Sequence, residues 1–193
     1  MKKKILYIAA ILICLSIITS GTLAYYTASD TARNVITSGG VDIAIEEWQQ
    51  TDGGLVPYPK DTPIHVMPSV TVSKLVTVRN HDAESFIRAK LTVTVLDADG
   101  KVMELTDAQR NAVIHLTMNS EDWTEKDGWW YYTEAVDTGT VTEPLLTAVS
   151  FDGPNMTNEF QNCTVQIDVN AQAVQRANNS DNVLDALGWP ESE

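Results

Sequence analysis

The segment IRAKLTVTV, residues 87–95, alternates apolar and polar side chains without interruption. In an extended chain, Ile87, Ala89, Leu91, Val93 and Val95 all fall on one face. A period of two is typical of a β-strand that buries one face and exposes the other. Because strands with one polar face belong to antiparallel rather than parallel sheets, this segment predicts an antiparallel architecture.

The same alternation recurs along the chain. It predicts strands over residues 41–48, 70–78 and 163–173, with weaker candidates at 129–132 and 145–151. Turn-forming sequences separate these segments, among them Asn80-His81-Asp82-Ala83 and Asp97-Ala98-Asp99-Gly100. Roughly seven to nine such strands in about 150 residues predict an all-β, two-sheet antiparallel sandwich of jelly-roll-like or immunoglobulin-like type.

Helical signals are few. Thr106 and Gln109 form the two ends of a capping box, which predicts a short helix to about Val113. Ser180 could cap a second helix whose Val183, Leu184 and Leu187 share a face, with Gly188 and Pro190 ending it. The predicted sandwich therefore carries one or two short helices.

The amino terminus has the pattern of an export signal. Lys2, Lys3 and Lys4 precede an apolar run from Ile5 to about Ile18, and Thr22-Leu23-Ala24 supplies the small residues that a signal peptidase requires. The apolar run is shorter than the roughly 20 residues of a membrane span, although a retained anchor is the alternative. We predict cleavage between Ala24 and Tyr25, which leaves no stable membrane span. The expected organisation is a signal peptide (1–24), an extended arm (25–40) and a sandwich domain (41–193).

The net charge limits the possible partners. The whole chain has a formal charge of −13, and removal of residues 1–24, which carry three lysines and no acidic residue, makes it −16. Such a balance argues against nucleic acid as a partner, because phosphate binding needs clustered Lys and Arg. A strongly negative charge also keeps an exported protein soluble.

The sequence contains no recognisable catalytic or metal-binding motif. His65, His81 and His115 are not spaced as metal ligands, and a calcium loop of the EF-hand type does not fit around Asp97. Cys163 lies in phase with the apolar face of its strand and is predicted to be a buried, unreactive thiol. We therefore predict no enzyme activity, no cofactor and no metal ligand.

The aromatic block Trp129-Trp130-Tyr131-Tyr132, with Trp123 nearby, is the most unusual local feature. In a strand, Trp129 and Tyr131 face one way, and Trp130 and Tyr132 face the other. One pair is expected in the core. The other is either packed at its rim or exposed as an interaction surface, for example for a matrix polysaccharide or a protein partner.

Several blocks of the chain resemble the TasA and camelysin family, which comprises exported proteins of Gram-positive bacteria with a dedicated type of signal peptidase. The leader region carries the most specific part of the resemblance, and the strand blocks extend it over most of the chain. Three of the matching blocks are Gly21-Thr22-Leu23-Ala24-Tyr25-Tyr26-Thr27, Gly40-Val41-Asp42-Ile43-Ala44-Ile45-Glu46-Glu47 and, near the end, Leu187-Gly188-Trp189. Two further blocks, Val76-Thr77-Val78-Arg79-Asn80 and Ser85-Phe86-Ile87-Arg88-Ala89, together look like a core hairpin of the family.

The resemblance implies a jelly-roll domain secreted to the cell surface or biofilm matrix. It further implies fibres in which the amino-terminal arm of one subunit completes the sheet of the next, so that the partners are further copies or related fibre subunits. The apolar anchors of this donor arm would be Tyr25, Tyr26, Val35 and Ile36. An arm inserted into its own sheet and a disordered tail remain the alternatives.

Two other functions are compatible with the sequence. The first is a secreted glycan- or partner-binding module that uses Trp129–Tyr132. The second, less favoured, is a metallopeptidase, because camelysin carries that label. The chain lacks a zinc motif, so the resemblance is not extended to this activity.

Overall fold

The computed structural model describes residues 41–59 and 64–190. Contacts divide the chain into two units, residues 1–31 and 32–193, and all described residues belong to the second. The predicted signal peptide, its cleavage point at Ala24 and Tyr25, and the predicted arm lie outside the described residues.

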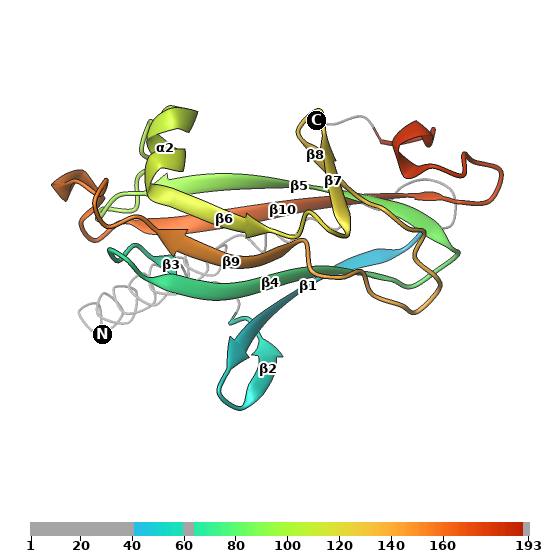
Figure 1. Cartoon of the computed structure of the whole chain (residues 1–193), viewed down its shortest axis with the longest axis horizontal. Helices are drawn as coiled ribbons and strands as arrows, with labels where there is room; N and C mark the ends of the chain where they lie inside the picture. Colours follow the sequence, from blue (N-terminus) through green and yellow to red (C-terminus); the bar gives the residue numbers. More distant parts are fainter. Residues whose placement is uncertain (1–40, 60–63, 191–193) are drawn as a thin grey trace, which may run out of the picture. The chain divides into compact units, whose positions relative to one another are not determined.

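The described chain forms two five-stranded sheets in which every strand pair is antiparallel. In the first sheet the order is β2 (Gly54–Pro57), β1 (Ile43–Thr51), β4 (Thr71–Asn80), β9 (Leu146–Phe151) and β6 (Ile114–Met118). In the second sheet it is β3 (Ile64–His65), β10 (Thr164–Gln175), β5 (Ser85–Leu96), β8 (Trp129–Tyr132) and β7 (Trp123–Lys126). Figure 1 shows β5 and β10 lying over β4 and β1, which confirms the all-β two-sheet sandwich.

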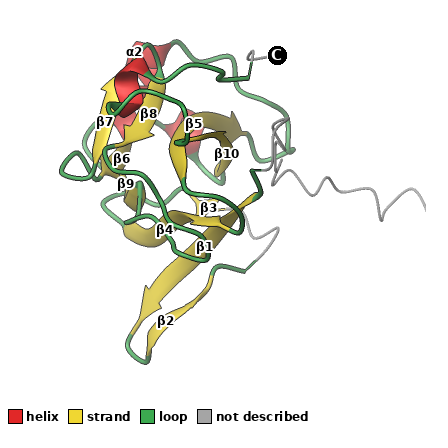
Figure 2. Cartoon of the chain, turned by 90° about the vertical axis from the view of Figure 1, so that its right-hand side faces the viewer, coloured by secondary structure: helices red, strands yellow, loops and turns green. Residues whose placement is uncertain are grey.

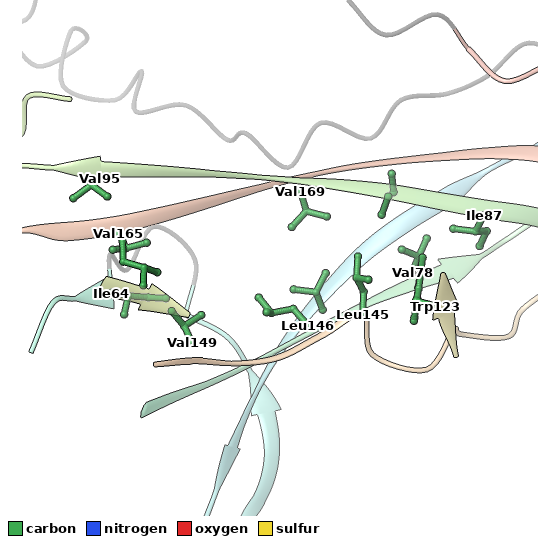
Figure 3. Close-up of a cluster of buried hydrophobic side chains, with 14 of the residues drawn as sticks. Ile64, Val78, Ile87, Val95, Trp123, Leu145, Leu146, Val149, Val165 and Val169 are labelled. Carbon is green, nitrogen blue, oxygen red and sulfur yellow. The ribbon is translucent and has the colours of Figure 1, made fainter. Parts of the chain in front are cut away.

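The pairing of β5 with β10 is the longest in the molecule. It runs without a break from Thr164↔Leu96 to Gln175↔Ser85. Figure 3 shows Val165 and Val169 of β10 pointing toward Leu146 and Val149 of β9, in the other sheet. The faces predicted from alternation are therefore confirmed, and the two sheets share one apolar core.

The segment after Asn80 connects two sheets rather than two neighbouring strands. β4 ends at Asn80 in the first sheet, and β5 begins at Ser85 in the second, so the hairpin implied by the resemblance is wrong. The fully buried Asn80 holds this arch, because its Nδ2 donates to the carbonyl oxygens of Ala83 and Val136, each at 2.8 Å. These bonds fix a crossing that alternation alone cannot distinguish from a hairpin.

The helical predictions are partly correct. α2 spans Asp107–Val113, and Thr106 and Gln109 form the predicted capping box. The second helix is only a 3₁₀ turn, η2 (Val183–Asp185), and Asn182 caps it instead of Ser180. The backbone is extended from Ala186, and Leu187 is 78% exposed, so the predicted apolar face does not form. η1 (Asn158–Phe160) is a further short 3₁₀ turn.

Candidate functional site

All four residues of the aromatic block lie on β8 and are packed against other side chains. Trp129 and Tyr131 are buried in a second apolar cluster, which also includes Val183 and Ala186 of the carboxyl-terminal segment. Trp130 and Tyr132 are half-buried and pack against the main core. Both faces of β8 are therefore packed against other side chains, and Trp130 and Tyr132 remain partly exposed.

Arg88 lies at the centre of the second cluster. The centre of its guanidinium group is 4.3 Å from the ring centroid of Trp129, 4.6 Å from that of Trp189 and 5.9 Å from that of Tyr131. Such distances allow a cation–π attraction to each ring. Arg88 therefore ties the carboxyl-terminal segment to β8.

The hydrogen bonds of Arg88 go to neutral acceptors. Its Nε and Nη2 donate to Oε1 of the buried Gln172 at 2.9 and 2.7 Å, and Nη2 also donates to the carbonyl oxygen of Pro190 at 3.1 Å. Nη1 donates to the hydroxyl of Tyr131 at 3.1 Å. The alternation in the sequence places Arg88 on the polar face of its strand. It cannot indicate these partners, because residues 172 and 190 are distant from Arg88 in the chain.

The outer edge of β10 is paired over only a small part of its length. Among the described residues, β3 pairs with Thr164 and Val165 alone. The amide of Val66 donates to the carbonyl of Cys163 on the β3 side, whereas the amide of Arg176 donates to Glu84 on the β5 side. Since backbone directions alternate along a strand, odd-numbered residues direct their N–H and C=O away from β5.

Within the described residues, the middle of β10 pairs with β5 on one side only. Ile167, Val169 and Ala171 have no strand partner on the side away from β5 within residues 41–59 and 64–190. Ala173 and Gln175, which lie farther along β10, each have an interaction partner. β1, at the corresponding side of the other sheet, lies close to β10.

A second opening lies between β5 and β6. A groove of about 430 Å³ is lined by Leu91–Val93 of β5, by Arg110 and Asn111 of α2, and by Ile114–Leu116 of β6. Figure 1 shows β6 lying between β9 and β5, and Figure 2 shows the β1–β2 hairpin extending beyond the sheets. Among residues 41–59 and 64–190, β10 on one lateral side and β6 on the other therefore each have an edge without a full-length strand partner.

The structure buries the thiol of Cys163, as the sequence predicts, and leaves His115 exposed. Cys163 is 1% exposed, and burial, with a smaller effect of Asp97, raises the pKa of its thiol. His115 Nε2 lies 4.0 Å from a carboxylate oxygen of Asp152. In the described part of the chain, no group of three or more His, Cys, Asp or Glu side chains could hold a metal ion.

No helix among the described residues is long and apolar enough to cross a membrane. The class that the fold of the described residues defines is an antiparallel two-sheet β-sandwich. Comparison of the chain with protein-family models, with curated proteins and with solved structures found no match.

Proposed function

We propose that this protein is a secreted structural component of the cell surface or biofilm matrix that self-assembles, or joins fibres, through its amino-terminal arm, residues 25–40. The observation that supports this proposal is the unpaired sheet edge, which is found on both sides of the described sandwich. The export pattern of residues 1–24 and the resemblance to the TasA and camelysin family supply the location.

An unpaired edge inside a sandwich favours the addition of a strand. Each buried backbone donor or acceptor without a partner costs about 1–3 kcal/mol. An extended arm satisfies several such groups at once and can insert apolar side chains between the sheets. When the arm comes from another copy, the contact is head-to-tail and propagates into a fibre.

The arm can be tested directly by comparing three purified chains. These are Tyr25–Glu193, a truncation starting at Ser38, and the longer chain with Val35→Ser and Ile36→Ser. We expect fibres only from the first, by negative-stain electron microscopy and sedimentation, because the truncation lacks all four apolar anchors and the double variant lacks the two nearest to β1. Thr37→Ser is the matched control and should assemble normally. If Tyr25–Glu193 remains monomeric over a wide concentration range, the proposed function is wrong.

Assembly is expected to depend on salt and pH. Subunits with a formal charge of −16 repel one another, and salt or protonation of carboxylates reduces that repulsion. Raising salt from about 10 to about 100 mM shortens the screening length from roughly 30 to roughly 10 Å and should accelerate fibre growth. Light scattering at several salt concentrations and pH values measures the rate. Equal rates at neutral pH in low and high salt would contradict this prediction.

A further inference from the structure

We propose that the acceptor for the arm is the groove between β5 and β6, and that the arm which fills it comes from a second copy of this chain. This inference rests on the proposed function and adds the location of the acceptor. The edge of β10 is the competing acceptor within the described residues.

β6 offers an open backbone edge along the groove. The amide of Asp152 donates to the carbonyl of Val113, which places odd-numbered residues of this strand toward β9. The backbone groups of Leu116 and Met118 therefore point away from β9, and no described strand pairs with them. Because β6 is the last strand of its sheet, an added strand would extend that sheet by one.

The opposite wall of the groove, on β5, contributes two apolar side chains, Leu91 and Val93, on either side of the exposed Thr92. Leu91 and Val93 of β5 are half-buried, and their side chains pack against the main core. β8 pairs with β5 only at Arg88 and Ala89, so β8 does not extend along β5 as far as Leu91 and Val93. A strand on β6 would direct every second side chain toward Leu91 and Val93 and would cover them.

In the same chain, the two apolar anchors nearest to β1, Val35 and Ile36, are too close to β1 in sequence to reach this groove. Ile43 pairs with Asn80, whereas Leu116 pairs with Val149, which pairs with Val72. Eight residues along β4 and three strand spacings correspond to about 26 Å along and about 14 Å across the sheet, or roughly 30 Å. The seven residues from Ile36 to Ile43 span at most about 25 Å.

The edge of β10, in contrast to the groove, is within reach of the arm of the same chain. It lies close to β1, so the residues that immediately precede β1 can reach it in the same chain. Insertion of a chain into its own sheet is therefore compatible with β10, whereas Val35 and Ile36 can fill the groove between β5 and β6 only in another copy.

One pair of variants distinguishes the two acceptors. Val93 in the groove and Ile167 on β10 are direct cross-strand neighbours on the same face, and both are half-buried. In Tyr25–Glu193, Val93→Lys should raise the protein concentration needed for assembly about ten-fold or more, because a charge would face the inserted arm. Ile167→Lys should change it less than about two-fold. Thermal unfolding checks that both variants are folded.

Cross-linking provides a second readout that does not depend on disrupting the groove. One chain carries Val35→Cys or Ile36→Cys, and a second carries either His115→Cys on β6 or Gln166→Cys on β10. Both acceptor positions are exposed, and Cys163 is buried and stays unchanged. Paired strands bring Cβ atoms within disulfide range, so mild oxidation of the assembled mixture should link the arm to the His115→Cys chain.

The outcomes separate the inference from the proposed function. Disulfide-linked dimers with His115→Cys and not with Gln166→Cys support the groove. Linkage to Gln166→Cys instead, or to neither position in fibres that do form, overturns the groove as acceptor and leaves the proposed function standing. If the unmodified Tyr25–Glu193 forms no fibres, the proposed function itself fails.

Discussion

Replacing Asn80 by aspartate (Asn80→Asp) is expected to lower the free energy of unfolding by about 3–5 kcal/mol at neutral pH. Asn80 is fully buried, and its Nδ2 donates to two carbonyl oxygens, of Ala83 and Val136. A carboxylate of the same shape has no hydrogen to donate and would direct negative charge at both carbonyls. The loss combines two broken hydrogen bonds with an unpaired buried charge, while Ser85 still donates to the carbonyl of Ala83 through its Oγ and to that of Val136 through its amide.

The effect of this substitution should depend on pH. Burial and the two carbonyls would raise the pKa of the introduced carboxyl above its unfolded value of about 3.9. A protonated carboxyl can still donate one hydrogen bond. The variant should therefore come closest to the unmodified protein below about pH 4 and should lose stability as pH rises through the folded-state pKa.

Chemical denaturation at several pH values, at concentrations where the protein is monomeric, measures this loss. Asn111→Asp is the matched control, because Asn111 is exposed, and it should change stability by less than about 0.5 kcal/mol. A deficit for Asn80→Asp that is as small as the control would show that the side chain of Asn80 does not hold the arch between β4 and β5.

Replacing Arg88 by methionine (Arg88→Met) is expected to release the carboxyl-terminal segment and to cost about 2–3 kcal/mol. The guanidinium group contacts the rings of Trp129 and Trp189, and it donates hydrogen bonds to Gln172 and Pro190. Methionine preserves the apolar stem but removes every donor, which also leaves Oε1 of the buried Gln172 without this partner.

Hydrogen exchange of residues 183–190 measures the release, and denaturation measures the stability. Arg88→Lys is the matched control. It keeps the charge but cannot reproduce the planar fork, so it should recover only part of the protection. Unchanged exchange in Arg88→Met would show that the remaining contacts, among them the packing of Val183 and Ala186 and the hydrogen bonds between Asn179 and Leu187, hold the segment in place.

The strands that the sequence predicted best are those with the simplest burial. β5 and β10 bury one face in the core along most of their length, so alternation of side chains was sufficient to find them. The strand β6 was missed, although Ile114, Leu116 and Met118 do alternate with polar residues. It follows directly after α2, and its five residues are too short for alternation to separate them from the end of a helix.

The candidate site depends on contacts between distant residues. Arg88 and Trp189 are 101 positions apart, and nothing local to either residue indicates that they stack. The groove likewise combines residues of β5, α2 and β6, and its existence depends on where β8 stops pairing with β5. The sequence left open whether one face of the aromatic block is packed or exposed, because the segment that covers Trp129 and Tyr131 lies far from the block in the chain.

The sequence by itself determined the strand faces, the capped helix, the buried cysteine and the two-sheet class, because each follows from side-chain periodicity or from bonds between residues close in the chain. Only the tertiary structure decided which strands are neighbours and which edges lack a partner. Strand order depends on how the strands of both sheets pack around the core, and many orders satisfy the same alternation. Backbone hydrogen bonding at an edge is a property of that order, since every residue except proline carries the same donor and acceptor.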